Sequence, residues 1–388
     1  MRWLTNLQLA GDDPARAEAG WRWRVGVDDG GRIARVRPTP PGSRAGGEDW
    51  GGDWLSPGGV DLQINGGLGL AFPELTPGDL PRLEALLDLL WRDGVDAICP
   101  TLVTCAPQAL RQSLTVLAEA RRRHRPGRCR LLGAHLEGPF LAPERRGAHP
   151  ARHLQAPSRA ALERLSAGFA GGPEADVALV TLAPELEGAA EVIAALRSAG
   201  VVVCLGHSGA DAAQARRAFA DGVGMLTHSF NAMAGLLHRA PGPVAAACLR
   251  GDVALGLIAD GVHVAPSMAV LLQRLAPEQV VLVSDALAPY GLGEGRHRWD
   301  ERLLLVEDGS CRLEDGTLAG VTLPLLEGVK RLASWGAAPE RAIAAATVLP
   351  RRLLGDDRSV EQVLVGTPLR ETLRWHEGPT GLQWERPA

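Results

Sequence analysis

The sequence predicts an α/β fold: a (β/α)8 TIM-like barrel with a small β-sandwich domain beside it. From residue 57 onward, short apolar runs alternate with amphipathic segments of helical length, which is typical of parallel strands joined by helices. There are eight such runs, and eight parallel strands close most simply into a barrel. Both ends of the chain instead carry short alternating segments around turn sequences, as in antiparallel β-structure. A doubly wound open sheet is the alternative for the central part.

Residues 1–56 are expected to form the first part of the small β-domain. Within them, the alternating segment 21–36 is interrupted at 28–31 by Asp-Asp-Gly-Gly, a hairpin pattern. Residues 351–388 end in a strand, turn and strand pattern and are expected to complete the same domain. The barrel is then assigned to residues 57–350, so the two chain ends would meet outside it.

The barrel strands and helices follow from the apolar runs and the amphipathic segments between them. The expected strands are 59–64, 96–101, 131–136, 177–182, 201–206, 224–227, 254–259 and 280–284. The expected helices between them are 80–91, 107–123, 159–169, 188–198, 211–220, 243–250 and 266–275. After the last strand, a hairpin is expected at 303–313, followed by helices at 321–334 and 339–349.

Composition and charge argue against several classes of function. The formal net charge is -4 and 22% of the residues are charged, so no basic surface for nucleic acid or for a membrane is expected. No apolar run approaches the ~20 residues that cross a bilayer. The six cysteines are scattered without a C-x-x-C pair, which favours reduced thiols in a cytoplasmic protein.

Polar residues with metal-binding or acid–base chemistry stand at the ends of four expected strands. Glu137, His207, His228 and Asp285 end the third, fifth, sixth and eighth strands. Because the carboxyl ends of barrel strands meet at one rim, these residues are expected to lie together. Two histidines and a glutamate match the three protein ligands of a catalytic zinc site, and Asp285 is suited to accept and return a proton. Each residue alone also fits a structural role, as a hydrogen-bonded group or a cap.

Nine motifs extend this pattern along about residues 57–355. They are 57–66, 135–140, 147–149, 181–185, 206–208, 227–233, 258–264, 282–286 and 316–320. Together they resemble the N-acetylglucosamine-6-phosphate deacetylase family of the amidohydrolase superfamily. The resemblance implies hydrolysis of the acetamide of N-acetyl-D-glucosamine 6-phosphate to D-glucosamine 6-phosphate and acetate, in amino-sugar catabolism, by a cytoplasmic homodimer. The alternatives are another metal amidohydrolase, acting on N-acyl amino acids or cyclic amides, and a non-catalytic sugar-phosphate sensor.

The resemblance also implies roles for single residues. Glu137, His207 and His228 correspond to metal ligands, Asp285 to the catalytic carboxylate, and His149 to a histidine near the substrate carbonyl. The positions that would contact substrate are Gln63, Asn65, His149, Asn231, Ala232, Arg239 and His263. In the family, the positions of Arg239 and His263 lie near the sugar phosphate, and one phosphate contact can come from the neighbouring subunit.

Gln63 and Asn65 stand where the superfamily usually carries a His-x-His pair. Neutral amides are poor replacements for imidazole at a transition metal. One divalent ion per chain is therefore expected, with Zn²⁺ favoured and Fe²⁺, Co²⁺ or Mn²⁺ as alternatives. His135 lies two residues before Glu137, so strand alternation points it to the same side. It is expected to support the site by hydrogen bonding.

Overall fold

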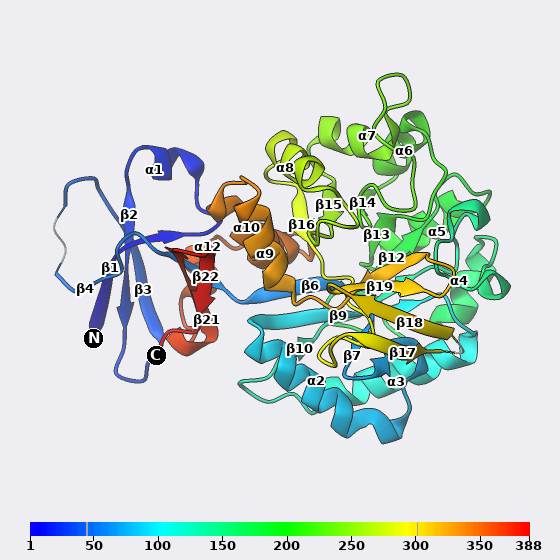
Figure 1. Ribbon diagram of the computed structural model, residues 1–388, viewed down its shortest axis with the longest axis horizontal. Coiled ribbons are helices and arrows are strands. Elements are labelled where there is room, and N and C mark those ends of the chain that lie inside the picture. The colour runs from blue at the N-terminus through cyan, green and yellow to red at the C-terminus, as the bar shows by residue number, and fades with distance from the viewer. Residues whose placement is uncertain (44–45, 301) are drawn as a thin grey trace.

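The computed structural model describes residues 1–43, 46–300 and 302–388. It consists of a small β-structure built from both ends of the chain and a larger α/β part beside it (Figure 1). None of the helices in the described ranges is long and apolar enough to cross a membrane.

The larger part is a barrel of parallel strands. They are β6 (Gly59–Ile64), β9 (Val95–Val103), β11 (Ala134–Glu137), β12 (Val177–Leu182), β13 (Val202–Leu205), β14 (Val223–Leu226), β15 (Ala254–Leu257) and β16 (Val280–Leu282). Each pairs in parallel with the next. The barrel closes because the Asn65 N–H donates to the Ala286 carbonyl at 2.7 Å and the Asp285 N–H donates to the Gln63 carbonyl at 2.8 Å. The predicted barrel is confirmed, and the open-sheet alternative is wrong.

Helices cover the outside of the barrel. They are α2 (Leu80–Arg92), α3 (Pro107–Arg122), α4 (Arg159–Ser166), α5 (Ala189–Ser198), α6 (Ala212–Ala220), α7 (Gly242–Arg250), α8 (Pro266–Leu275), α9 (Leu325–Ser334) and α10 (Pro339–Thr347). In α2 the buried residues are Leu83, Leu86, Leu87 and Leu90, which recur at helical spacing on one face. Burying each leucine contributes about 1.5–3 kcal/mol, so such faces hold the helices on the strands.

Short elements occupy the connections. They are the two-residue strands β7 (Gly66–Gly67), β8 (Leu70–Ala71) and β10 (Arg130–Leu131), and the 3-10 helices η1 (Phe72–Glu74), η2 (Pro77–Asp79), η3 (Pro143–Arg145), η4 (Ala151–His153) and η5 (Leu369–Glu371). The expected strand 131–136 is divided between β10 and β11. Gly133 breaks it, because the Gly133 N–H donates to the Pro173 carbonyl at 2.8 Å instead of to a neighbouring strand.

The small β-structure joins segments from the start and the end of the chain. Its strands are β1 (Arg2–Leu9), β2 (Arg22–Val27), β3 (Ile33–Thr39), β4 (Glu48–Asp49), β5 (Trp54–Pro57), β21 (Thr372–Gly378) and β22 (Gly381–Glu385). Strand β1 pairs with β2 from Arg2 to Leu7 and with β5 at Gln8 and Leu9, so it links the sheet β1–β2–β3 to the sheet β5–β21–β22. The short helices α1 (Pro14–Glu18) and α12 (Val360–Leu364) complete this end of the molecule, and the short helix α11 (Leu349–Leu353) packs against the barrel strands β6 and β16.

The expected β-sandwich and the meeting of the chain ends are confirmed by the antiparallel pairing of β21 with β5, which sets Leu373 opposite Ser56. The core between the sheets includes Leu4, Trp23 and Leu55. The domain boundaries at 56/57 and 350/351 stay predictions.

A four-stranded antiparallel sheet is inserted between β16 and α9. It comprises β17 (Gly295–Trp299), β18 (Arg302–Glu307), β19 (Ser310–Leu313) and β20 (Leu318–Val321). The hairpin expected at 303–313 is confirmed by β18 and β19. Strands β17 and β20 were not expected from the sequence, because β17 is mostly polar and exposed and β20 contains Gly320 in its interior. Figure 1 shows this sheet lying across the face of the barrel.

Candidate active site at the carboxyl ends of the strands

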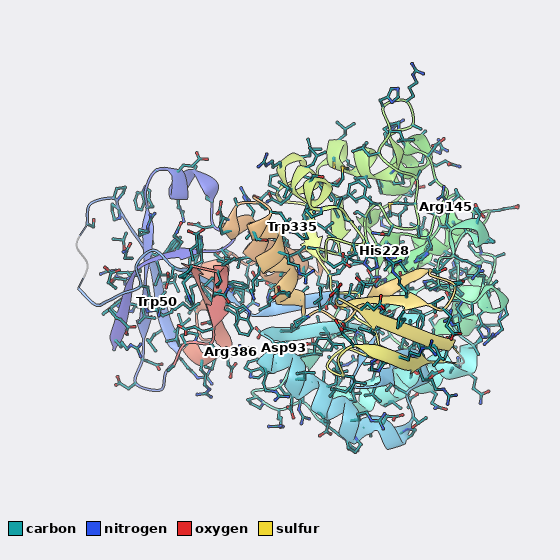
Figure 2. All side chains as sticks on the ribbon, in the orientation of Figure 1. Trp50, Asp93, Arg145, His228, Trp335 and Arg386 are labelled. Carbon is teal, nitrogen blue, oxygen red and sulfur yellow. The ribbon has the colours of Figure 1, made fainter. Side chains whose placement is uncertain are left out.

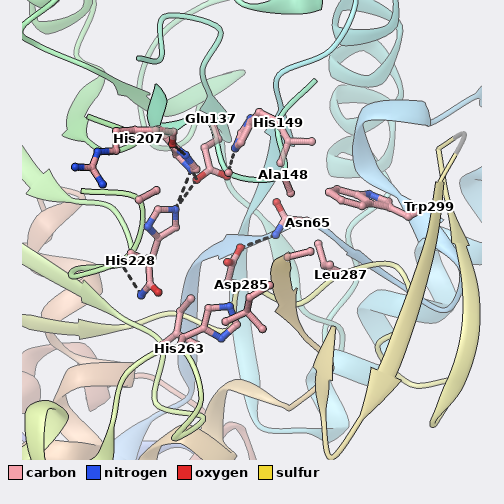
Figure 3. A pocket seen from close by; sticks show the side chains of 18 of the residues that line it. Asn65, Glu137, Ala148, His149, His207, His228, His263, Asp285, Leu287 and Trp299 are labelled. Carbon is pink, nitrogen blue, oxygen red and sulfur yellow. Dashed lines mark hydrogen bonds and ion pairs between the residues drawn. The ribbon is translucent and has the colours of Figure 1, made fainter. Parts of the chain in front are cut away.

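A pocket of about 310 Å³ opens at the carboxyl ends of the barrel strands. Most of the residues singled out in the sequence line it (Figure 3): Asn65, Glu137, His149, His207, His228, Asn231, Ala232, His263 and Asp285. Gln63 and Arg239 are not among the residues that line it. His228 and Arg145 are labelled in Figure 2 on the barrel side of the molecule, away from the small β-structure.

Glu137, His207 and His228 place three potential ligand atoms around one point. Glu137 Oε1 lies 3.1 Å from His207 Nε2 and 3.0 Å from His228 Nε2. The two Nε2 atoms are 3.1 Å apart. Ligand atoms bound at about 2.0–2.1 Å in a tetrahedral zinc site lie about 3.3–3.4 Å from one another, so this triangle is close to the size such an ion requires.

The hydrogen bonding of His207 tests whether a cation fits there. His207 Nδ1 lies 2.8 Å from the Arg145 carbonyl, which only accepts, so Nδ1 carries the proton. With its proton on Nδ1, His207 directs its Nε2 lone pair at the Glu137 carboxylate, 3.1 Å away. Two electron-rich atoms of buried groups therefore face each other, and a cation between them removes the repulsion.

His149 offers a second way to complete a buried ligand group. Glu137, His149 and His207 have ligand atoms within 4.8 Å of one another. However, the Thr104 N–H donates to His149 Nδ1 at 3.3 Å, which leaves the ring proton on Nε2. Burial lowers the pKa of His149 to about 3, so the ring is neutral. His149 thus presents an N–H donor to the pocket, and His228 is the better third ligand.

The backbone is strained at three of these positions. His207, His228 and Asp285 have φ of 49°, 29° and 50°, although none is glycine. Such conformations cost on the order of 1–3 kcal/mol each and cluster at functional sites, where packing holds them. Each residue lies two or three positions beyond the end of its strand, and all three line the pocket.

Asp285 lies beside this group and is held by two amides. Its Oδ1 accepts a hydrogen bond from Asn65 Nδ2 at 2.7 Å and from Gln63 Nε2 at 3.2 Å. Gln63 Nε2 also donates to Glu137 Oε1 at 3.2 Å, so one amide links the two carboxylates. Burial, followed by the negative charge of Glu137, raises the pKa of Asp285 to about 8. The amides therefore act as donors that hold two carboxylates close together.

His135 lies beneath this site within the barrel. Its Nδ1 is 3.1 Å from the Leu62 carbonyl and its Nε2 is 2.7 Å from Thr181 Oγ1. Burial lowers the pKa of His135 to about 4, so the ring is neutral. Both ring nitrogens are engaged, which leaves none for a metal. These bonds join strands β6, β11 and β12, in agreement with the expected supporting role.

Of the other residues expected to contact substrate, His263 and Asn231 line the pocket, whereas Arg239 lies outside it. His263 Nδ1 lies 2.6 Å from Asp260 Oδ2, so its other nitrogen is free to face the pocket. Asn231 Nδ2 is 3.3 Å from the carbonyls of His228 and Ser229. Arg239 is exposed in the segment 235–240 that leads to α7 and projects from the barrel in Figure 1.

Some lining residues had no signal in the sequence. Arg145, Leu287, Trp299 and Leu318 line the pocket, but they belong to loops or to the inserted sheet. Arg145 accepts the hydrogen bond from His207 Nδ1 through its backbone carbonyl, a group that every residue type has. Trp299 ends the unexpected strand β17. Their contributions depend on how distant loops pack together.

Glu185 is a further residue whose contacts were not foreseen, although its motif was recognised. Glu185 Oε2 accepts the Ser208 hydroxyl at 2.6 Å, and Oε1 accepts the Gly209 N–H at 2.5 Å. The Ser208 N–H in turn donates to the Ala232 carbonyl at 3.0 Å. Glu185 therefore fixes the turn that directly follows His207 and holds its strained backbone.

Glu185→Ala is expected to weaken divalent-metal binding about 10–100-fold, because partners that orient a ligand typically contribute that much. Competition with a chromogenic chelator measures this affinity. Glu187→Ala removes a neighbouring exposed carboxylate that makes no such contact and serves as the control. Wild-type metal affinity in a folded Glu185→Ala protein would contradict the prediction.

Comparison with known proteins points to one family. A scan against protein-family models finds no match. Human N-acetylglucosamine-6-phosphate deacetylase is 38% identical over 322 residues, which cover 80% of this chain and 77% of the human protein. N-acetylgalactosamine-6-phosphate deacetylase of Escherichia coli O157:H7 is 34% identical, with 88% of both chains covered.

A solved structure agrees with these relatives. It is a mutant of N-acetyl-D-glucosamine-6-phosphate deacetylase from Mycobacterium smegmatis in complex with N-acetyl-D-glucosamine-6-phosphate. It superposes with a TM-score of 0.79 at 28% identity, over 98% of this chain and 96% of that chain. With the pocket, the group of potential metal ligands and these similarities combined, the chain belongs to the N-acetylglucosamine-6-phosphate deacetylase family of amidohydrolases.

Proposed function

We propose that this protein hydrolyses the acetamide of N-acetyl-D-glucosamine 6-phosphate to D-glucosamine 6-phosphate and acetate, as a step of amino-sugar catabolism. The observation that carries the proposal is the convergence of Glu137, His207 and His228 beside Asp285 in one buried pocket. A sensor protein would not need a proton acceptor there. Other amidohydrolases share the barrel, but the relatives at 34–38% identity are hexosamine-phosphate deacetylases.

The residues have separate tasks in this reaction. Asp285 accepts a proton from the attacking water and returns it to the departing amine. His149 donates its Nε2 hydrogen to the carbonyl oxygen as that oxygen gains negative charge, and a donor of this kind is worth about 2.7–4 kcal/mol of barrier. A divalent ion held by Glu137, His207 and His228 supplies Lewis-acid polarisation and lowers the pKa of a coordinated water.

We propose one ion per chain, Zn²⁺ being preferred. Gln63 Nε2 and Asn65 Nδ2 both donate to Asp285, so amide hydrogens stand where a second ion would need lone pairs. The donor set of one carboxylate and two imidazoles suits zinc in a catalytic site. Fe²⁺, Co²⁺ and Mn²⁺ accept the same donors and remain alternatives to be distinguished by metal analysis.

We also propose that the protein works as a cytoplasmic homodimer. Leucines stand exposed on α7, on α8 and in the segment before α7: Leu249 at 86%, Leu275 at 58% and Leu237 at 62%. A second copy would cover such a surface. The six cysteines are all free, which fits a reducing compartment.

An acetate-release assay with N-acetylglucosamine 6-phosphate, before and after chelator treatment, tests the function. We expect turnover that is lost with chelator and restored by one equivalent of metal. A panel of N-acetylgalactosamine 6-phosphate, an N-acetyl amino acid and a cyclic amide separates the alternatives. Preferential hydrolysis of either of the last two would overturn the proposed substrate class.

Arg239→Ala is expected to raise KM for N-acetylglucosamine 6-phosphate more than 10-fold and to change unphosphorylated N-acetylglucosamine little. The guanidinium fork suits phosphate oxygens. Arg239 is exposed in the segment before α7, so we propose that it reaches the pocket of a neighbouring subunit. Steady-state kinetics on both sugars measure this. Arg35→Ala, on the exposed side of β3, is the control, and equal KM changes for both sugars would place the phosphate elsewhere.

A further inference from the structure

The pocket has two sides of different chemistry. Figure 3 shows Ala148, Leu287 and Trp299 on one side of Asp285 and Asn65, and His207 and His228 on the other. The first side is an apolar wall, which also includes Val103 and Leu318. The opposite side carries imidazoles, an amide and the glutamate. A substrate with one apolar and one polar end therefore has one favoured orientation in this pocket.

Trp299 is the largest residue of the apolar wall, and it is held firmly. It is 5% exposed and packs in a cluster with Leu287 and Leu304. The Arg302 guanidinium lies 4.5 Å from the centre of the indole ring, and Arg302 Nη1 donates to the Ala148 carbonyl at 2.7 Å. The tryptophan is thereby fixed against the loop that carries His149.

The small exposed fraction of Trp299 limits what it can contact. One face of the indole is covered by the Arg302 guanidinium, and the apolar cluster packs against the ring. A pyranose ring needs an open aromatic face for stacking. The remaining surface suits a contact the size of a methyl group.

The proposed reaction places the scissile carbonyl between His149, Asp285 and the three proposed metal ligands. Its carbon carries two substituents, the sugar amine and the acyl chain. The amine leads to a polyhydroxyl sugar and its phosphate, which match the polar side with His263 and Asn231. The acyl methyl group then faces the apolar wall, where its transfer from water is favourable.

We propose that Trp299 closes an acyl pocket that accepts a methyl group and rejects longer chains, and so determines acyl specificity. This inference rests on the proposed deacetylation. In the reaction, water forms the new C–O bond and the C–N bond breaks. The acid leaves as a carboxylate and the amine takes the proton, whatever the acyl length. Trp299 therefore acts on the choice of substrate and leaves the chemistry unchanged.

The test compares kcat/KM for N-acetyl, N-propionyl and N-butyryl glucosamine 6-phosphate. A methylene that a pocket must accommodate or reject changes specificity roughly 10–200-fold. The wild type is expected to prefer acetyl over butyryl by at least about 100-fold. Trp299→Ala should reduce this ratio at least 10-fold by raising the relative rate of the butyryl substrate, and Trp299→Phe should be intermediate.

Leu305→Ala is the matched control, because Leu305 lies on the neighbouring strand β18 and is 38% exposed. It should keep the wild-type ratio. If Trp299→Ala does not fold, Trp299→Phe and Leu287→Ala carry the test. An unchanged ratio in folded variants would overturn the inference, as would an equal loss on all three substrates with a raised KM, which would indicate contact with the sugar. A wild-type protein that releases no acid from any of them would instead contradict the proposed function.

Discussion

Asp285→Asn is expected to bind metal and substrate but to lose about 10²–10⁴-fold in kcat, the range typical of general acid–base groups. Asparagine keeps an oxygen at the position that accepts the 2.7 Å bond from Asn65, so the local structure should persist. It cannot accept and return a proton. Because the group contributes to the chemical step, kcat should fall much more than KM rises.

Steady-state kinetics and metal analysis of the same Asp285→Asn preparation check this. Asp252→Asn, an exposed carboxylate paired with Arg250, is the control and should behave as the wild type. Turnover of Asp285→Asn within a few-fold of the wild type would remove Asp285 from the proton-transfer role. A variant that lacks metal as well would assign the loss to the metal centre.

Glu137→Gln is the second change with a large expected effect: it should abolish high-affinity metal binding and, with it, activity. Glutamine keeps the shape of the side chain but removes the negative charge that faces His207 and His228 at 3.0–3.1 Å. A ligand bound at about 1,000 times its Kd stabilises the folded state by about 4 kcal/mol. Added metal should therefore raise Tm of the wild type and not of Glu137→Gln.

Thermal unfolding with and without added Zn²⁺, together with metal content after dialysis, measures the effect of Glu137→Gln. Glu163→Gln, an exposed carboxylate on α4 paired with Arg159, is the control. One equivalent of tightly bound metal in Glu137→Gln would show that the ligands lie elsewhere. A retained Tm shift without stoichiometric metal would point to binding at another surface.

The barrel strands were predictable because they are buried on both faces. Strands β6 and β12 are buried at every position, so each reads as an apolar run of strand length. The residue after such a run is placed at the rim by the topology, which is why Glu137 and Asp285 could be expected together. Burial of the strands and the barrel topology thus determine where Glu137 and Asp285 lie, with little contribution from the loops.

Other features depend on contacts that no local pattern records. Strand β17 has a polar sequence and is stabilised by pairing with β18, so periodicity gave no indication of it. The carboxylate of Glu185 holds the turn after His207 across 23 residues of sequence. Arg145 contributes a carbonyl oxygen, which is common to all residues. Such contacts arise only when loops from several strands come together.

The closure of the barrel has a consequence for the order in which the protein becomes active. The bonds that join the first and last strands are made by Gln63, Asn65, Asp285 and Ala286, so the proposed proton acceptor, Asp285, and its amide donors lie where the barrel closes. During synthesis, Glu137, His207 and His228 emerge from the ribosome before Asp285. A nascent chain can therefore gather its proposed metal ligands early, but it acquires the proposed proton acceptor only when residues 222 positions apart come together. Appearance of activity during refolding should accordingly mark the completed barrel and not its first helices and strands.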